Sequence, residues 1–536
     1  MFTHEAQESQ YQALSAGRTG FLTNDVFDVN AGDSKTATNG GGTYPWAMES
    51  YLGRLTYNYD NRYLLTATYR RDGSPNFGED KRWGSFPSIS AAWRIKNEQF
   101  FNVDAISDLK LRYEFGYTGN QGTGSGVYAS MNNYATQWGT GFLPATFTNP
   151  LLQWEETQTN NVGLNAGFIN NRFTVEADYY SRKTNNLILN ANLPWYMGTN
   201  GVGSVGAPLV NTGDLETKGW SLTFNTVNIV NKDFKWESNL NISHFKTIVD
   251  KLYQSSQFIS RTSWWMNGWT QRSYVGQQPW LFMGYQEEGL FQSIDEIQKS
   301  AVPVDQSGNR VPVSASNGLW VGDVKYRDIN GDGKIDQNDQ TIIGNPWPKL
   351  TGGFTNTFNY KGIELSILII GSYGNDVYNY IAADASNPNN INLSRNLMVR
   401  ALEYAKITTD GSGNPKLANP ETRVPRISNN TISADNNFSK ITDRFLEDGS
   451  YLRLKNISVS YSIPDRYLRY TKGVIKGFKL TFSAQNIATW TSYKGYDPEV
   501  GAYVGTGSAG NNQAIGIDFG RYPITPMYIG TLSVNF

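Results

Sequence analysis

Residues 51–74 read YLGRLTYNYDNRYLLTATYRRDGS, and their side chains alternate between apolar and polar types. Leu55 and Tyr57 stand on odd positions, Arg54 and Thr56 stand on even ones, and the alternation resumes after residues 60–61. A period of two predicts a β-strand with one apolar and one polar face. Residues 60–61 are Asp-Asn, and both residue types accept the left-handed backbone of tight hairpins. The stretch therefore predicts two antiparallel strands joined at that dipeptide.

The same alternation recurs along the chain. It is found in KLRYEFGYTG (110–119), RFTVEADYYSR (172–182), FKWESNLNISHF (234–245) and the C-terminal MYIGTLSVNF (527–536). Further short connections are expected near 170–171, 231–233 and 361–362, and long ones over 183–216, 249–347, 374–450 and 488–523. Short turns on one rim and long loops on the other are typical of outer-membrane β-barrels. We expect about thirteen strands, with residues 1–4 as the stub of another and 5–47 as a long loop.

The apolar face of such a barrel points to lipid, and the polar face lines a wet interior. The reverse arrangement would place Arg54, Arg112 and Glu176 in hydrocarbon, at about 2–4 kcal/mol for a basic residue near the midplane. Tyr and Trp near strand ends are expected at the level of the lipid headgroups. A soluble β-sandwich usually has shorter strands, and a propeller repeats at a fixed period that this sequence lacks.

Composition excludes several other classes of protein. The 536 residues carry a formal net charge of −1, no cysteine and two histidines, His4 and His244. These counts give no general attraction to nucleic acid, no disulfide and little material for a His-based metal site or catalytic triad. No apolar run is long enough for a membrane-spanning helix. No nucleophile with its base, paired-acid constellation or phosphate-binding loop stands out, so we predict that the chain is not an enzyme.

The sharpest local motif is DINGDGKIDQND at residues 328–339. It matches the twelve-residue calcium loop, with Gly333 at the sharp turn of position six. The expected ligands are Asp328, Asn330, Asp332, the Lys334 carbonyl, Asp336 and Asp339. Ligands that are all oxygen favour Ca²⁺, with Mg²⁺ second. Position 12 is Asp rather than Glu, and a Gly/Asp turn without metal is the alternative.

A second candidate is an aromatic loop surface in SWWMNGW (263–269), QPWLFMGY (278–285) and LWVG (319–322). Flat rings stack on sugar faces, so we expect exposed indoles there to bind substrate. The candidate residues are Trp264, Trp265, Trp269, Trp280 and Trp320. The alternative is that these rings pack the long loops together or against a partner.

Six segments in order resemble the SusC-like (RagA-like) TonB-dependent transporters of Bacteroidetes outer membranes. They are YNYDNRYLLTATYRRDGSPNFGEDKRWGSFPSISAAWRI (57–95), DLKLRYEFGYTGNQG (108–122), WEETQTNNVGLNAGF (154–168), GDVKYRDINGDGKIDQNDQTIIGNPWPKLTGGF (322–354), FLEDGSYLRLKNISVSYSIP (445–464) and SAQNIATWTSYKGYDPEV (483–500). The resemblance implies import of large nutrients, oligosaccharides first and peptides second. It also implies work with a SusD-like surface lipoprotein and energy from TonB.

The resemblance further implies a barrel of about 22 strands with a plug domain. Residues 1–536 supply about thirteen strands and no plug, so we expect one domain, the C-terminal part of the barrel. The chain then looks like a truncated or split product located in the outer membrane. The sequence leaves one alternative of another class, a surface or secreted β-rich protein that binds glycan or mediates adhesion without transport.

Overall fold

The computed structural model describes the chain except residues 123–126, 129–130, 192, 194–196, 198–204, 253–257, 263–268, 306, 389, 391–395, 472 and 505–512. Within the described residues, fourteen strands form one sheet in the order β1-β2-β3-β4-β5-β8-β9-β12-β13-β22-β23-β28-β29-β33. Their bounds are β1 Phe2–Gly17, β2 Thr38–Tyr59, β3 Tyr63–Gly73, β4 Trp83–Arg94, β5 Ile106–Asn120, β8 Glu155–Phe168, β9 Phe173–Asn185, β12 Asp214–Val230, β13 Phe234–Lys251, β22 Leu350–Tyr360, β23 Ile363–Tyr373, β28 Tyr451–Ser462, β29 Gly477–Thr491 and β33 Met527–Asn535. No helix among the described residues is long and apolar enough to span a membrane.

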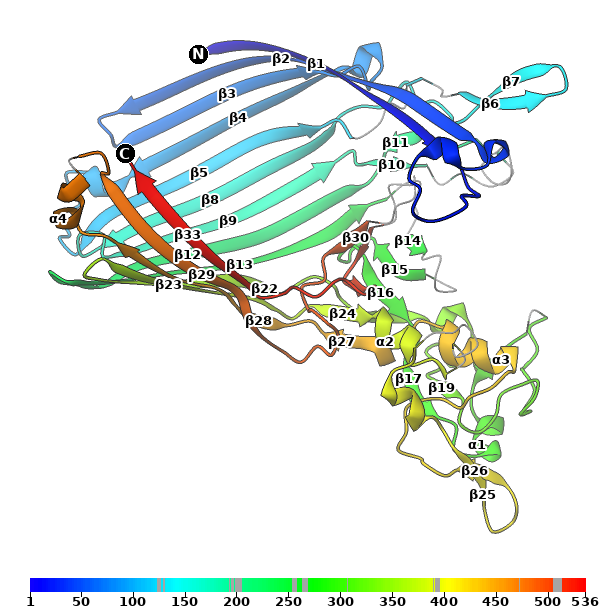
Figure 1. Ribbon diagram of the computed structural model, residues 1–536. Helices are drawn as coiled ribbons and strands as arrows, with labels where there is room; N and C mark the ends of the chain where they lie inside the picture. The colour runs from blue at the N-terminus through cyan, green and yellow to red at the C-terminus, as the bar shows by residue number, and fades with distance from the viewer. Residues whose placement is uncertain are drawn as a thin grey trace. The chain divides into compact units, whose positions relative to one another are not determined.

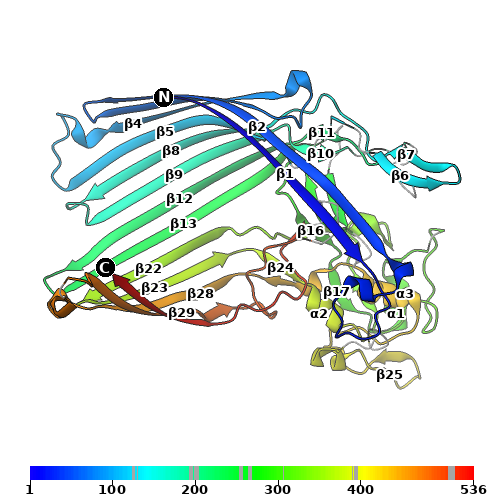
Figure 2. The same cartoon turned by 45° about the horizontal axis from the view of Figure 1, so that its top comes forward.

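The chain divides into two compact units. Unit 1 comprises residues 1–97, 112–162 and 182–214, and unit 2 comprises 98–111, 163–181 and 215–536. Strands β1 to β4 belong to unit 1, and β13, β22, β23, β28, β29 and β33 belong to unit 2. Within each group, neighbouring strands are antiparallel and lie side by side (Figures 1 and 2).

In unit 1, the registers confirm the hairpin predicted from residues 51–74. Tyr57 pairs with Leu65, and Leu55 pairs with Ala67, so apolar residues face the same side of the two strands. The turn residues Asp60 and Asn61 have φ values of 49° and 51°. This is the left-handed backbone that a two-residue hairpin turn needs and that Asn and Asp tolerate.

In unit 2, one face of the sheet is predominantly apolar across several strands, with the register partners Ser238 and Asn356 as polar exceptions. One row of register partners runs Phe354, Ile369, Leu454 and Ala488. Another row runs Tyr360, Ile363, Tyr461, Leu480 and Leu532. Most alternate positions carry Ser, Thr, Asn or charged residues, such as Ser460 opposite Thr481, and Leu368 and Ile370 of β23 are apolar exceptions. The predicted separation into an apolar and a polar face is therefore present.

The connections alternate between short and long, as predicted. Only residues 361–362 join β22 to β23, and Lys361 and Gly362 have φ values of 48° and 86°. In contrast, the segments 252–349 and 374–450 separate consecutive strands of the sheet. Folded loop structure can form only in the long connections, because a two-residue turn is too short to hold further strands or helices.

The prediction of a long loop over residues 5–47 is wrong. Strand β1 covers most of the N-terminal part of that range and pairs with β2 from Phe2↔Gly53 to Gly17↔Thr38. The sheet thus has fourteen strands in the described residues: β1, whose stub was expected at residues 1–4, and thirteen others. The sequence HEAQESQYQALSAG (4–17) has few large apolar residues, so its pairing comes from the backbone ladder and leaves little periodic signal.

In unit 2 the long connections fold into small sheets and short helices, grouped at the β24 end of strands β22 and β23 (Figure 1). Their strands are β14 Phe258–Thr262, β15 Trp269–Tyr274, β16 Leu281–Gly284, β17 Glu287–Leu290, β18 Val302–Pro303, β19 Val324–Tyr326, β20 Lys334–Ile335, β21 Thr341–Gly344, β24 Asp376–Asn379, β25 Ile407–Thr409, β26 Pro415–Leu417, β27 Leu446–Asp448, β30 Ala502–Val504, β31 Gln513–Ile515 and β32 Ile517–Asp518. The α-helices are α1 Ile294–Lys299, α2 Tyr380–Ala385, α3 Thr431–Ala434 and, between β28 and β29, α4 Asp465–Leu468. Unit 1 adds β6 Met131–Thr136, β7 Gly139–Pro144, β10 Ile188–Asn190 and β11 Leu209–Asn211.

Candidate functional site

The loop structure of unit 2 has its own apolar cores. One buried cluster contains Phe282, Tyr378, Phe445 and Ile517, which come from three long connections of the sheet. A second contains Tyr285, Val321, Tyr326 and Leu417, and a third is centred on Phe291 and Leu319. Burial of such side chains stabilises a fold by about 1.5–3 kcal/mol each. These loops are therefore held as a folded body, which can present side chains in fixed positions.

A buried polar network ties two of these loops together. Asp323 is fully buried and accepts hydrogen bonds from Arg426 Nε at 2.7 Å, Ser433 Oγ at 2.6 Å and Asn437 Nδ2 at 2.9 Å. The backbone N–H of Trp320 donates to its second carboxylate oxygen. A buried carboxylate is tolerated when it is paired and its lone pairs are satisfied. The network fixes residues 319–326 against 426–437.

A charged cavity lies beside this network. Its volume is about 560 Å³, within the range of ligand-binding pockets. The cavity is lined by Glu287, Glu288, Gly289, Leu290, Gln292, Glu296, Lys325, Pro420, Glu421, Thr422, Arg423, Asp443, Arg444 and Leu446. No aromatic side chain is among these described lining residues, so the cavity offers charge and hydrogen bonds rather than stacking.

Ion pairs organise the cavity wall. Lys325 Nζ lies 3.2 Å from Glu296 Oε1 and 3.4 Å from Glu288 Oε2. Arg444 lies 2.8 Å from Glu287, and both side chains are nearly buried. Burial raises the pKa of Glu287 above its ordinary value, and the neighbouring Arg444 opposes that rise. The wall can therefore bind a polar ligand through charged groups, but it holds no nucleophile and base arranged for catalysis.

Arg453 connects the wall of the sheet to the loop after β29. Its side chain is 1% exposed and contacts Asp497 and Glu499 at 2.6 Å each, while Nε donates to Thr489 Oγ1 at 2.9 Å. This cluster was not predicted from the sequence. Its members fall within two of the segments quoted above, 445–464 and 483–500. Arg453 follows the alternation of its strand, between Leu452 and Leu454, so no local sequence pattern marked it as buried.

The acidic turn at 328–339 closes largely through its own backbone. Asp328 accepts from the N–H groups of Gly331 and Gly333, at 2.6 and 2.8 Å. Asp332 Oδ1 accepts from Lys334 N at 2.9 Å, and Asp336 Oδ1 accepts from Asn338 N at 2.7 Å. Asp339 is buried and accepts from Ile329 N and Asp336 N, at 2.9 and 2.8 Å.

The side chain of Asn330 donates to Asp332 Oδ2 at 3.1 Å, and the backbone of Lys334 lies in β20, which pairs with β18. In the part of the chain that the structure describes, no group of three or more His, Cys, Asp or Glu residues is arranged to hold a metal ion. The turn is thus stable as a hydrogen-bonded Asp/Gly loop, and Ca²⁺ or Mg²⁺ binding by it stays a prediction.

The tryptophan candidates are only partly brought together. Trp264 and Trp265 lie outside the described residues, and of Trp269 only the backbone, in β15, is described. Trp280 and Trp320 are half-buried rather than exposed, and Trp320 packs against the cluster of Tyr285 and Val321. The packing role is therefore the one observed for Trp320, because the loops enclose their own apolar core. Substrate binding by all five indoles stays a prediction.

Comparison with known proteins identifies the family. The model of the family described as "TonB dependent receptor-like, beta-barrel" matches residues 3–321. The two-faced antiparallel wall and its long folded loops agree with this match. The chain belongs to the TonB-dependent receptor β-barrel family, whose members are outer-membrane proteins and not enzymes.

Curated relatives come from Bacteroidetes. TonB-dependent receptor P3 of Formosa agariphila is 30% identical over 99% of this chain and 50% of its own length. TonB-dependent receptor SusC of Bacteroides thetaiotaomicron is 31% identical over 91% of this chain and 44% of its own length. The chain thus spans about half the length of the curated relatives it matches. The resemblance to SusC-like transporters seen in the sequence is confirmed.

Solved structures agree with the fold. The RagAB peptide importer in its "closed-closed" state has a chain that superimposes with a TM-score of 0.77 and 23% identity, covering 100% of this chain and 53% of that one. The structure titled as the RagAB peptide transporter gives 0.75. At this identity the likeness supports the fold alone.

Proposed function

We propose that the chain forms part of the wall and the outer loops of a TonB-dependent importer of large nutrients. The observation that supports this most directly is the combination of a predominantly apolar sheet face with a mostly polar one in a member of this receptor family. An apolar outer face suits lipid, and a polar inner face suits the passage of hydrated cargo.

The folded loops of unit 2 supply the surface on which cargo and a partner would act. We propose that a SusD-like surface lipoprotein binds there and that TonB energises the complete importer, as SusC-like relatives imply. Oligosaccharide is the first candidate cargo and peptide the second. The charged cavity at Glu287 and Lys325 is compatible with hydrogen bonding to either.

Uptake in the native bacterium tests the proposal. Cells carrying or lacking the gene receive fluorescent oligosaccharides and fluorescent peptides, and internal fluorescence is measured with and without a protonophore. The proposal expects uptake that needs both the gene and the proton gradient. Cargo that binds to the surface but never enters would contradict it and would favour the adhesion alternative. When the affinity-tagged protein is extracted in detergent and purified, a lipoprotein is expected to co-purify with it in stoichiometric amount.

A further inference from the structure

The segment after β29 folds back against the polar face of the sheet in unit 2. Arg453 stands one position before Leu454, which belongs to the apolar face, so the Arg453 side chain emerges on the polar face. Asp497 and Glu499 each contact this guanidinium at 2.6 Å. Residues 493–500, which we call the strap, therefore cover the polar side of β28 and β29.

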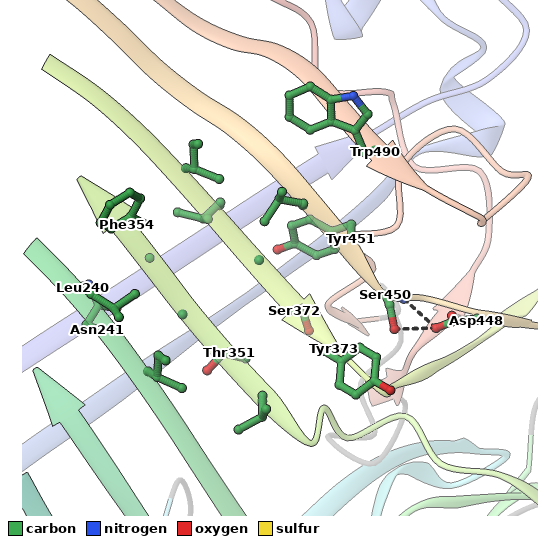
Figure 3. Close-up of a pocket in the computed structure, with 18 of the residues that line it drawn as sticks. Leu240, Asn241, Thr351, Phe354, Ser372, Tyr373, Asp448, Ser450, Tyr451 and Trp490 are labelled. Carbon is green, nitrogen blue, oxygen red and sulfur yellow. Dashed lines mark hydrogen bonds between the residues drawn. The ribbon is translucent and has the colours of Figure 1, made fainter. Parts of the chain in front are cut away.

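The strap lies at the end of the sheet where the long connections begin. Arg453 is the third residue of β28, and its hydrogen-bond partner Thr489 is third from the end of β29. Tyr451 and Trp490 mark the same end of these two strands (Figure 3). The two-residue turn at 361–362 lies at the opposite end. In an outer-membrane receptor, the end with the long connections faces the outside.

Further contacts fix the start of the strap. The Tyr493 hydroxyl donates to the buried Asp518 carboxylate at 2.6 Å. The backbone N–H of Lys494 donates to Glu447 Oε2 at 2.8 Å. Hydrogen bonds to ionised groups are the stronger kind, and the ion pairs of Arg453 add a second attachment further along. The strap is therefore held on a fixed course over the polar face.

One aromatic ring of the strap faces solvent. Tyr496 is 67% exposed, whereas Tyr493 is 5% exposed. Within the residues that the structure describes, the Tyr496 side chain takes part in no hydrogen bond, ion pair or ring contact. The ring is thus not used to hold the strap in place. Because its backbone is already ordered, little further ordering is needed when the ring contacts a ligand.

A row of hydroxyl groups follows the strap along the polar face. The register partners in this row are Thr357, Ser366, Ser458 and Ser483, on four neighbouring strands. Ser458 lies five positions after Arg453 in β28, which corresponds to about 17 Å. Hydroxyl groups can donate and accept hydrogen bonds and carry no charge. The row therefore suits a neutral ligand with many hydroxyl groups better than a charged one.

We propose that the strap is a cargo-binding site in which Tyr496 stacks on a sugar ring of a neutral oligosaccharide and Arg453 is the positioning residue. The C–H groups on one face of a pyranose pack against the negative face of an aromatic ring. The hydroxyl row then offers hydrogen bonds to later sugar units of the same chain. The inference rests on the proposed function, because cargo reaches the strap only if it passes along the polar face.

Uptake kinetics in the native bacterium test this assignment. The gene carries each substitution at its own locus, and initial uptake rates of neutral fluorescent oligosaccharides are measured over a range of concentrations. Tyr496→Ala should raise KM about three- to tenfold, as expected for loss of one ring contact. The maximal rate per receptor should stay within about twofold, because the ring acts in binding. Tyr496→Phe keeps the ring and should keep the KM of the unmodified receptor.

Tyr470→Ala is the matched control. Tyr470 is 87% exposed and lies in the connection between β28 and β29, at the end of the sheet opposite the strap. Its KM should equal that of the unmodified receptor. The amount of each folded receptor in the outer membrane is measured by heat-modifiable migration in gels. An equal rise of KM in Tyr470→Ala and Tyr496→Ala would overturn the site.

Arg453→Lys tests the positioning role. Lysine keeps the charge but lacks the planar fork that contacts Asp497 and Glu499 together. KM should rise as in Tyr496→Ala, with the maximal rate per folded receptor preserved. A lower maximal rate with unchanged KM would mean that Arg453 only stabilises the fold, and would overturn the positioning role.

The outcomes separate this inference from the proposed function. If the unmodified receptor imports the oligosaccharide and Tyr496→Ala has the same KM, the strap assignment is overturned and the proposed function stands. If the unmodified receptor imports nothing, the proposed function is contradicted and this inference falls with it. A KM that rises for fluorescent peptides but not for oligosaccharides would overturn the sugar assignment.

Discussion

Arg426 Nε lies 2.7 Å from Asp323 Oδ1, and the two side chains are 8% and 0% exposed. The residues are 103 positions apart and come from different long connections of the sheet. This ion pair, with Ser433 and Asn437 around it, joins two loops into one body. The loops therefore behave as a folded part of the receptor, with stability that single substitutions can measure.

Arg426→Ala should destabilise the loop body strongly. Removing one member of a buried ion pair leaves the other charge uncompensated, at a cost of about 3–5 kcal/mol. Hydrogen–deuterium exchange over residues 319–326 and 426–437 should rise accordingly. Lys299→Ala is the control, because its pair with Asp295 is 74% and 70% exposed, and it should cost less than about 0.5 kcal/mol. Similar exchange in the two variants would contradict the structural role of the buried pair.

Arg453→Lys should loosen the loop after β29. The Arg453 guanidinium contacts Asp497 and Glu499 at once, whereas a lysine ammonium is a point charge without the planar fork. Loss of one charge-assisted hydrogen bond corresponds to about 1.5–3 kcal/mol. We therefore expect limited proteolysis to cleave the segment around Asp497 faster in Arg453→Lys than in the unmodified protein.

Lys479→Arg is a suitable comparison for Arg453→Lys, because Lys479 pairs with Glu364 at a half-exposed position of the same wall. Its proteolysis pattern should match that of the unmodified protein. If Arg453→Lys were as resistant as this control, Arg453 would not be the group that anchors the loop.

The pKa of Glu287 predicts a pH dependence of the loop body. Burial raises that pKa above its ordinary value of 4.5, with Arg444 opposing the rise. The folded state then binds more protons than the unfolded state, so this group's contribution to stability is complete below about pH 4.5 and is lost as pH rises through the folded pKa. The unfolding free energy of the wild type, minus that of Glu287→Gln, should therefore fall with rising pH. A difference that grows with pH would mean that the ion pair with Arg444 dominates.

The acidic turn provides a metal prediction. If Asp328, Asp332 and Asp336 bind Ca²⁺ as the loop spacing predicts, millimolar Ca²⁺ should protect residues 325–340 from proteolysis, and Asp332→Asn should abolish the effect. Mg²⁺ should protect less, because it demands near-octahedral geometry. Equal resistance to proteolysis in Ca²⁺ and in a chelator would contradict metal binding and would mean that hydrogen bonds alone hold the turn. Asp305→Asn is a control in a turn outside the motif, where Asp305 caps Ser307 and Asn309.

Local patterns predicted the wall well and the loops poorly. The turn at Asp60-Asn61 and the two faces of β2 and β3 follow from period two and from residues that accept positive φ. Strand β1 was expected only as a stub at residues 1–4, because the rest of it lacks large apolar side chains at alternate positions. The Asp323–Arg426 pair could not be predicted, since it depends on contacts between loops 103 residues apart. Trp320 illustrates the ambiguity of exposed-looking aromatic runs, because an indole in a loop can pack as easily as it can bind.

Site-directed spin labelling tests the central claim, the opposite character of the two sheet faces, most directly. The chain has no native cysteine, so single nitroxides can be placed at Leu55 and Phe482 on the apolar face and at Thr56 and Thr481 on the polar face. In vesicles, collision with oxygen should exceed collision with a water-soluble nickel chelate at the first pair, and the order should reverse at the second. Greater exposure of Leu55 and Phe482 to the nickel chelate than to oxygen would contradict a lipid-facing apolar wall.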